Sequence, residues 1–391
     1  MLLRSSNNLM RDRDGPHDGK VATVELFFDL VFVFAITQLS HGLLHHFTPL
    51  GAVEMLVLLL AVWWVWMYST WALNWLDPEL LPVRLLLYGL MLAGLFISMS
   101  IPEAFGARGL SFGLAFAASQ IGRSLFCAWA MAGWSPTRHL NFQRITCWML
   151  VSGLFWIGGG LAPPHLRLPI WLLALGIEYA GPIAAFQVPG LGRSSTTDWD
   201  VHGEHIAERC GLFVIICLGE TLLINGATFA EMEWTGIGMQ AFMANFLGTV
   251  AMWWIYFHIG YERAAHTIEA SEDPGQIARV AFTYAHIPII AGIVLTAVAA
   301  ELVIAHPGGH TGPGAAAAIL GGPGLFLLGT LWFKKLTAGW APLSHLVGLG
   351  LMLLLALVSS WFTPLGLTLS ATAVLMLVAA WEHRSLGRGH A

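Results

Sequence analysis

Two carboxylates stand four residues apart inside an apolar segment near the start of the chain. Glu25 and Asp29 belong to residues 24–41, which otherwise have the composition of a membrane-spanning helix. Helical spacing puts both groups on one face, about 40° apart. Because charged side chains in lipid are costly, such a pair is typical of a polar path for ions or solutes. The alternative is that both carboxylates pair with Arg84 or Arg279 at the ends of neighbouring helices.

Three further ionisable groups lie deep in other apolar segments. Arg123, Glu178 and Glu220 fall near the middle of three predicted spans. Two carboxylates and one guanidinium at similar depth favour a common internal polar cluster, in which one carboxylate lacks a full cationic partner. That carboxylate is a candidate for binding a proton or a cation. The alternative is a structural ion pair between Arg123 and Glu178 that locks two helices together.

Histidine clusters suggest metal binding at two places, and we predict no metal site at either. Four residues have spacings that could converge on a metal: His202, Glu204, His205 and Glu208. Their acidic members also suit a helix N-terminus, where they oppose the helix dipole. His41 and His45 have the i, i+4 ligand spacing but lie at the opposite membrane face, where solvated histidines are common. The chain also has no HExxH, GxSxG or phosphate-loop pattern, so we predict no cofactor and no enzymatic activity.

The composition is that of an integral membrane protein. Of the 391 residues, 57% are hydrophobic and 10% are charged, and the mean hydropathy is +0.69. These values are far from the averages of soluble domains. A net charge of -5 without a basic run argues against a nucleic-acid partner. The four cysteines form no CxxC pair, so we interpret them as reduced packing residues.

Apolar segments long enough to cross a hydrocarbon core of about 30 Å recur along the whole chain. We predict twelve spans, at residues 22–45, 51–75, 83–101, 109–133, 145–162, 168–186, 205–229, 234–261, 277–305, 315–333, 340–361 and 364–381. With both termini in the cytoplasm, fifteen of the 18 Lys and Arg residues fall on the cytoplasmic side, as the positive-inside rule requires. Only Arg108 and Arg167 fall outside, and Arg123 lies within a span.

Two tryptophan-rich segments indicate an internal repeat. Residues 61–66 (AVWWVW) and 251–256 (AMWWIY) are 190 positions apart, and residues 25–39 align loosely with residues 208–222. A separation of six helices makes the repeats parallel. We therefore predict an all-α membrane protein of two parallel six-helix repeats. Its predicted parts are a cytoplasmic tail at residues 1–20, repeats at 21–186 and 205–382, a cytoplasmic linker at 187–204 and a second cytoplasmic tail at 383–391.

Two long motifs carry a family resemblance. ELFFDLVFVFAITQLSH (residues 25–41) and HGEHIAERCGLFVIICLGETLL (residues 202–223), with the paired WW helices, resemble the bacterial low temperature requirement A family over nearly the full chain. The family's usual Phe after Glu-Arg is Cys210 here, which leaves the polar positions intact. The resemblance implies a multi-pass protein of the inner (plasma) membrane, linked by name to growth in the cold. The halves are also faintly similar to the lysosomal potassium channel family, although Phe27-Phe28-Asp29 lacks the serine of its FSD motif.

These patterns favour an ion-coupled transporter that uses buried carboxylates. The alternatives are a cation channel and a non-transporting membrane protein of cold adaptation. Pro182, Pro288 and the glycine-rich residues 321–324 are predicted to interrupt spans, which makes His286 a candidate pH-sensitive gate. The alternative is a kink that only improves helix packing. The expected partners are the lipid bilayer, an unknown small solute or ion, and a second copy of the chain. The transport or ion-binding candidates are Glu25, Asp29, Gln38, His41, Arg123, Glu178, Glu208, Arg209, Glu220 and His286.

Overall fold

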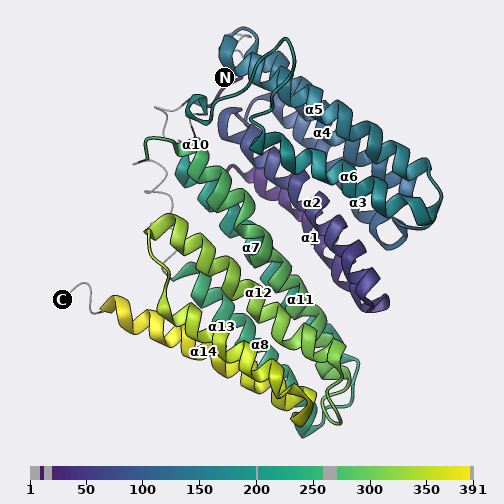
Figure 1. Ribbon diagram of the computed structural model, residues 1–391, viewed down its shortest axis with the longest axis vertical. Helices are drawn as coiled ribbons and strands as arrows, with labels where there is room; N and C mark the ends of the chain where they lie inside the picture. Colours follow the sequence, from purple (N-terminus) through teal and green to yellow (C-terminus); the bar gives the residue numbers. More distant parts are fainter. Residues whose placement is uncertain (1–8, 13–19, 200, 259–270, 388–391) are drawn as a thin grey trace. The chain divides into compact units, whose positions relative to one another are not determined.

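The computed structural model describes residues 9–12, 20–199, 201–258 and 271–387 (Figure 1). This part of the chain is all helical, and its only extended pairings are two isolated bridges, Met10 with Leu76 and Val188 with Gly192. Most of the predicted N-terminal tail lies outside the described residues. The same is true of the last four residues of the C-terminal tail and of residues 259–261 in the eighth predicted span.

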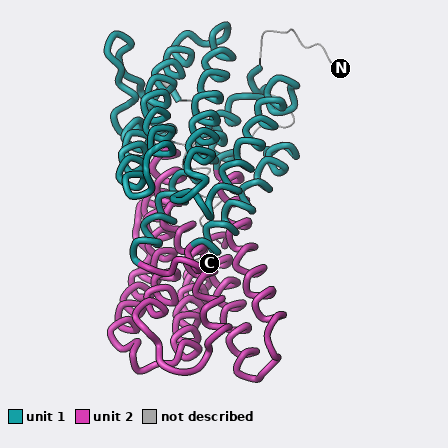
Figure 2. The backbone as a smooth tube through the Cα atoms, turned by 90° about the vertical axis from the view of Figure 1, so that its right-hand side faces the viewer, with its two compact units in different colours: residues 1–42, 49–206, 268–276 teal, residues 43–48, 207–267, 277–391 magenta. Residues whose placement is uncertain are grey.

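The chain folds into two compact units, coloured separately in Figure 2. Unit 1 comprises Met1–Gly42, Pro49–Ile206 and Ile268–Gln276, and unit 2 comprises Leu43–Thr48, Ala207–Thr267 and Ile277–Ala391.

Unit 1 is a helical bundle with a tightly packed centre. Its long helices are α1 (Thr23–His45), α2 (Pro49–Trp75), α3 (Leu81–Ser100), α4 (Gly109–Met131), α5 (Pro136–Leu161) and α6 (Pro164–Ile183). Helix α4 packs along α5, and α2 packs against both α4 and α6. A Cβ atom on Gly160 would lie 2.8 Å from the carbonyl oxygen of Gly109, so a glycine is required for this close approach. The arrangement lets polar side chains of α2, α4, α5 and α6 meet inside the bundle.

The end of α5 is capped by a buried arginine. Arg167 donates hydrogen bonds to the carbonyl oxygens of Gly159, Gly160, Ala162, Ala104 and Gly106. The last carbonyls of a helix have no partner within the helix, and this guanidinium supplies one. Arg167 therefore has a structural role.

Unit 2 is a second helical bundle. Its elements are the greater part of α7 (Gly203–Ala230), α8 (Gly236–Phe257), the π-helix η3 (Ala278–Tyr284), α11 (His286–Ala305), α12 (Pro313–Ala338), α13 (Leu343–Leu357) and α14 (Pro364–Gly387). The short helix α10 (Pro274–Ile277) belongs to unit 1 except for its last residue. Helix α11 packs along α12, and α8 packs against α14. A Cβ atom on Gly292 would lie 2.7 Å from the carbonyl oxygen of Gly322, so α11 and α12 also touch through glycine.

The helix breakers act differently from one another. The predicted interruption at residues 321–324 is wrong, because α12 continues through Pro323 and uses Gly322 for its contact with α11. Helix α6 ends at Ile183, one residue after Pro182. Before Pro288 the backbone widens into the π-helix η3, because proline has no N–H for the carbonyl four residues earlier.

Helices of membrane-spanning length dominate the fold. Nine helical segments in the described part of the chain are long and apolar enough to cross a bilayer. Helices α4 and α8 are also long, with 23 and 22 residues, but have less apolar sequence, while α13 has only 15 residues. Large apolar side chains such as Leu154, Ile183 and Leu353 are strongly exposed on the surface, as a lipid-facing surface requires. The chain is therefore a multi-pass membrane protein.

Candidate functional site

The carboxylate of Glu178, on α6, is buried and held by neutral donors. Its side chain is 0% exposed. Ser152 Oγ on α5 donates to one carboxylate oxygen at 2.5 Å, and Gln120 Nε2 on α4 donates to the other at 2.9 Å. Both oxygens are thus occupied without a cation in direct contact.

Arg123 lies one helical turn from Gln120 and completes the cluster. Its Nη2 group donates to Gln120 Oε1, and its Nη1 group donates to Val65 O and Ser69 Oγ, each at 3.3 Å. The guanidinium also lies over the ring of Tyr68, 5.1 Å from the centroid. Because a guanidinium can only donate and a carboxylate can only accept, the two charges fix the orientation of the Gln120 amide between them.

Aromatic side chains of α2 and α6 enclose this cluster. The rings of Trp64 and Tyr179 are stacked, with centroids 3.8 Å apart, and Tyr179 donates its hydroxyl to Leu60 O. Arg123 stands about 12 Å of helix from the nearer end of α4, at 1.5 Å per residue. The sequence therefore correctly brings Arg123 and Glu178 together, but as charges joined through an amide. Glu220, the third expected member, belongs to unit 2.

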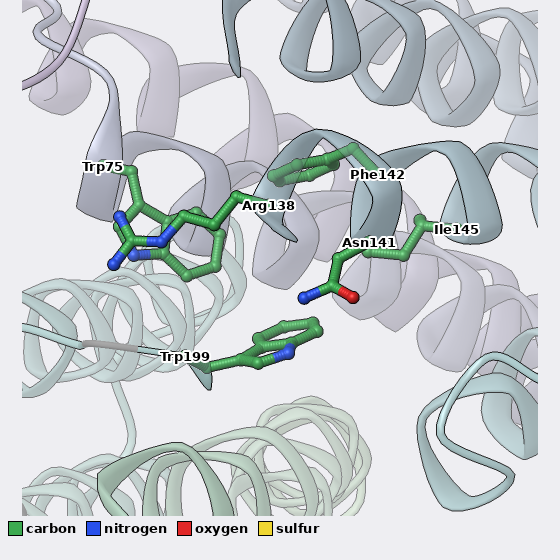
Figure 3. Close-up of a pocket in the computed structure, with 6 residues that line it drawn as sticks. All are labelled: Trp75, Arg138, Asn141, Phe142, Ile145 and Trp199. Carbon is green, nitrogen blue, oxygen red and sulfur yellow. The ribbon is translucent and has the colours of Figure 1, made fainter. Parts of the chain in front are cut away.

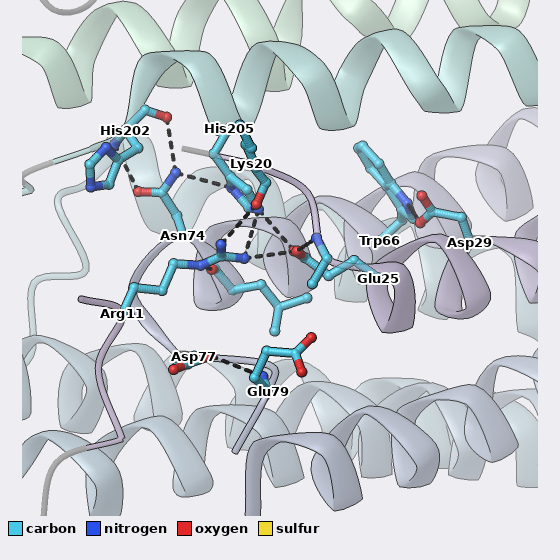
Figure 4. A network of polar contacts seen from close by, with 12 residues as sticks. Arg11, Lys20, Glu25, Asp29, Trp66, Asn74, Asp77, Glu79, His202 and His205 are labelled. Atoms are coloured by element: carbon cyan, nitrogen blue, oxygen red, sulfur yellow. Dashed lines mark hydrogen bonds and ion pairs between the residues drawn. The ribbon is translucent and has the colours of Figure 1, made fainter. Parts of the chain in front are cut away.

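Glu25 stands in a different, directly charged network near the start of α1 (Figure 4). Arg11 Nη2 contacts one carboxylate oxygen at 2.8 Å, and His205 Nε2 contacts the other at 2.8 Å. The backbone N–H of Ala22 also donates to this carboxylate, at 2.8 Å. The expected alternative partner, Arg84, instead pairs with Glu79 at 3.0 Å. The alternative in which Arg84 pairs with Glu25 is therefore wrong.

The network extends through the end of α2 into the start of α7. Arg11 donates from Nε to Leu73 O at 2.7 Å, and its own N–H donates to Trp75 O. Asn74 contacts His205 Nδ1 at 3.3 Å and exchanges two hydrogen bonds with the backbone of His202. Four chain segments are thus joined around one buried carboxylate, which indicates a structural role for Glu25.

Asp29, one turn along α1, is held by an indole. Trp66 Nε1 on α2 donates to its carboxylate at 2.8 Å, and both side chains are buried (Figure 4). The ring of Trp66 stacks on that of Trp63, with centroids 5.1 Å apart. Glu25 and Asp29 therefore share a helix face but have different partners.

Unit 2 contains a buried ion pair that the sequence did not predict. Lys334 Nζ on α12 contacts both carboxylate oxygens of Glu382 on α14, at 2.8 and 2.7 Å, and donates to Ile255 O at 3.0 Å. His345 Nδ1 on α13 lies 3.3 Å from the same carboxylate. Lys334 is only 5% exposed, so this lysine is paired inside unit 2 and is not solvated.

His286 is buried beside the π-helix of unit 2. Its Nδ1 atom lies 2.9 Å from Ala281 O, and its Nε2 atom lies 2.8 Å from the hydroxyl of Tyr256. The carbonyl can only accept, so Nδ1 carries the hydrogen and the Tyr256 hydroxyl donates to Nε2. The ring thereby satisfies a carbonyl of the π-helix.

The remaining candidate residues lie on helices α1 and α7 and differ in exposure. On α1, Gln38 is partly exposed and His41 is exposed. On α7, Glu208 is partly exposed, whereas Arg209 and Glu220 are buried. Among the residues that the structure describes, no three His, Cys, Asp or Glu side chains converge as metal ligands do.

A small aromatic pocket lies in unit 1 (Figure 3). It is lined by Trp75, Arg138, Asn141, Phe142, Ile145 and Trp199. Its cavity volume is only about 10 Å³, far below the range of about 300–1,000 Å³ for small-molecule sites. The guanidinium carbon of Arg138 lies 4.6 Å from the ring centroid of Trp134, and the ring centroids of Trp199 and Trp75 are 5.7 Å apart. The pocket is thus a packing feature that holds the segment containing Trp199.

The sequence analysis did not identify Gln120 and Ser152, the neutral residues around Glu178, although the spacing of Gln120 indicated its place. Gln120 precedes Arg123 by three residues, which places it on the same face of α4. Ser152 had no comparable signal, because serines are common in membrane helices. Arg11 and Asn74 also had none, since their role depends on how helix ends meet.

Comparisons with known proteins agree over almost the whole chain. A family model described as bacterial low temperature requirement A protein (LtrA) matches residues 20–380. An uncharacterized protein of Rhizobium meliloti (strain 1021) is 43% identical over 368 residues, which cover 94% of this chain and 90% of that protein. No solved structure matches the chain. The similarity spans both units.

Proposed function

The chain belongs to the bacterial low temperature requirement A family, and we propose that it is a proton- or cation-coupled transporter in which Glu178 holds the coupling ion. The matching Rhizobium protein is itself uncharacterized, so the proposal rests on this chain's own buried charges. Asp29 and Glu220 are further candidates for ion binding, since each is a buried carboxylate within an apolar helix.

The proposal rests on how the oxygens of Glu178 are occupied. Ser152 and Gln120 are neutral donors, so a proton or cation can join or leave the carboxylate without breaking a direct ion pair. A carboxylate deep in an apolar helix is a functional candidate by default, because burial without function is costly. Both neutral partners can reorient, since a hydroxyl and an amide each donate and accept.

The same proposal includes an orientation in the membrane. We propose twelve spans in two parallel repeats, in the bacterial inner membrane, with both termini in the cytoplasm. The distribution of Lys and Arg supports this orientation. Helices occur at each of the twelve expected positions in the described part of the chain, including the less apolar α4 and α8 and the short α13.

Reconstituted protein tests the transport proposal. Liposomes containing a pH-sensitive dye receive the purified protein and then an inward gradient of sodium, potassium, chloride or nitrate. We expect at least one gradient to drive uptake of protons or of radioactive sodium or rubidium. Glu178→Gln should lower that uptake at least tenfold, because an amide cannot release a proton. Glu79→Gln makes the same chemical change at an exposed ion pair and should behave as wild type.

Three results would contradict the proposal. Wild-type protein that moves none of these ions under any gradient would favour the non-transporting alternative. Unitary currents in a planar bilayer that persist in Glu178→Gln would favour a channel. Unchanged growth in the cold after neutralisation of every buried carboxylate would also argue against transport through these groups.

A further inference from the structure

The charges of the Glu178 cluster balance each other. Arg123 contributes one positive charge and Glu178 contributes one negative charge, and Gln120 joins them. Neither charged side chain is more than 2% exposed. The cluster is therefore electrically neutral when Glu178 is ionised, and it carries a single positive charge when Glu178 is protonated.

We propose that this cluster binds one proton and one small monovalent anion together, so that the protein is an electroneutral one-to-one proton–anion symporter. The inference rests on the proposed transport function and names its substrate class. The proton occupies the carboxylate of Glu178, and the anion binds to the guanidinium of Arg123. Only the O–H bond of Glu178 forms on loading and breaks on release.

The coupling follows from the cost of net charge inside an apolar bundle. The empty cluster is neutral, because Arg123 and Glu178 balance. The fully loaded cluster is also neutral, because the proton cancels Glu178 and the anion cancels Arg123. A cluster with only one of the two ligands has a net charge, which is costly to keep away from water. Both neutral forms can therefore interconvert between the two sides of the membrane, whereas the half-loaded forms cannot.

The hydrogen bonds of Arg123 allow an anion to replace them. Its acceptors are all neutral oxygens, from Val65, Ser69 and Gln120. The contacts of Nη1 are 3.3 Å long, beyond the usual 2.9–3.0 Å for an N–H donor. An anion makes shorter and stronger charge-assisted hydrogen bonds to a guanidinium than neutral oxygens do. An anion that enters the cluster can therefore displace Ser69 or Gln120.

The surroundings of Glu178 contain no competing charge among the described residues. From α4 the cluster receives Arg123 and, one turn further, Cys127, and from α2 it receives Tyr68. Helix α5 supplies the neutral Ser152. The arginine of α6, Arg167, is eleven residues from Glu178 and donates to backbone carbonyls. The rings of Trp64 and Tyr179 stack beside Glu178, with centroids 3.8 Å apart, so aromatic side chains border the cluster.

Chloride and nitrate are suitable probes, because neither crosses a bilayer as a neutral acid. Vesicles with equal potassium on both sides and valinomycin hold the voltage at zero. An inward gradient of either anion should then drive proton uptake by the wild-type protein, while an inward sodium gradient should not. Added chloride should also raise the melting temperature of the purified protein, and this increase should be larger at pH 5.5 than at pH 8.5.

Three substitutions separate the two ligands. Glu178→Gln mimics the protonated carboxylate, so it should lose proton uptake at least tenfold and keep exchange of radioactive chloride within threefold of wild type. Arg123→Gln removes the anion site and should lower both activities at least tenfold. Arg123→Lys keeps the charge and should recover part of the exchange, which a purely structural role of the guanidinium would not explain.

The outcomes distinguish this inference from the proposed function. Proton uptake driven by sodium or potassium, and insensitive to anions, would leave the transporter standing and overturn the symport of an anion. Arg123→Gln with wild-type anion exchange would overturn it as well. If no gradient moves protons or other ions and chloride does not stabilise the protein, both the function and the inference are wrong.

Discussion

The two units each bury a carboxylate beside a basic side chain, but they join the charges differently. In unit 1, Glu178 is held by Ser152 and Gln120, and Arg123 lies beyond the Gln120 amide. In unit 2, Lys334 contacts both oxygens of Glu382 directly, at 2.8 and 2.7 Å. The two sites contain similar groups and are both nearly inaccessible to water.

The difference teaches what a buried charge can do in a membrane. A direct pair resists any change of charge, because neutralising one partner leaves the other buried and alone. A bridged pair is more tolerant, because neutral donors can reorient when the carboxylate gains a proton. We therefore interpret Lys334 and Glu382 as a lock between α12 and α14, and Glu178 as the group that exchanges ions.

The largest expected effect comes from breaking the lock. Glu382→Gln leaves Lys334 without its counter-charge and should destabilise the protein by about 3–5 kcal/mol, because an unpaired buried charge is left behind. Thermal unfolding in detergent, followed by circular dichroism, measures the loss as a lower melting temperature. The double variant Lys334→Met with Glu382→Leu should be more stable than Glu382→Gln, since it removes both charges. Equal stability of Glu382→Gln and wild type would contradict the interpretation that Lys334 and Glu382 hold α12 and α14 together while Glu178 exchanges ions.

Much of the helical framework could be predicted from the sequence, because length and apolar composition are local properties. The helix α1 begins at Thr23 and ends at His45, within one residue of the expected 22–45. Arg123 and Glu178 could also be matched, since a cation and an anion at similar depth attract one another. Gln120 was within reach of the same reasoning through its helical spacing.

The partners of the other charges could not be predicted, because they depend on which helix ends meet. Arg11 lies in a short extended segment without helical or apolar pattern, yet it forms an ion pair with Glu25. Lys334 follows an apolar run in the same way as a solvated topology marker does, and only the packing of α12 against α14 buries it. The equivalent tryptophans of the expected repeat also differ, since Trp63 is 2% exposed and Trp253 is 45% exposed.

An intermediate effect is expected at Glu25, which has both a direct cation and other donors. Arg11→Ala removes one charged contact but leaves His205 and the N–H of Ala22 on the carboxylate. The loss should be about 1.5–3 kcal/mol, the range for hydrogen bonds to charged groups. The same unfolding measurement checks it, with Arg11→Lys as the control that keeps the charge. A loss as large as that of Glu382→Gln would mean that His205 and Ala22 contribute little.

A smaller effect on stability is expected at Glu178, despite the loss of transport. In Glu178→Gln the new amide oxygen can accept from Gln120, and its nitrogen can donate to Ser152 Oγ, which also reaches Met149 O at 3.2 Å. Every polar group keeps a hydrogen-bond partner, so the loss should be only about 1–2 kcal/mol, which includes the unbalanced charge of Arg123. Unfolding of this variant beside Glu382→Gln compares the same chemical change in the two units. A loss above that of Glu382→Gln would show that Glu178 and Arg123 act as a lock.

The smallest effect is expected at the exposed pair of Arg84 and Glu79, which sets the lower end of the comparison. Their side chains are 35% and 65% exposed, so water screens the attraction between them. Glu79→Gln should therefore change the stability by less than about 1 kcal/mol and should leave transport unchanged. Raising the salt concentration should reduce even this difference, whereas it should not reduce the effect of Glu382→Gln. A large, salt-insensitive loss of stability in Glu79→Gln would mean that exposure does not separate weak from strong charge pairs in this protein. The two buried clusters could then not be compared with a weak reference pair.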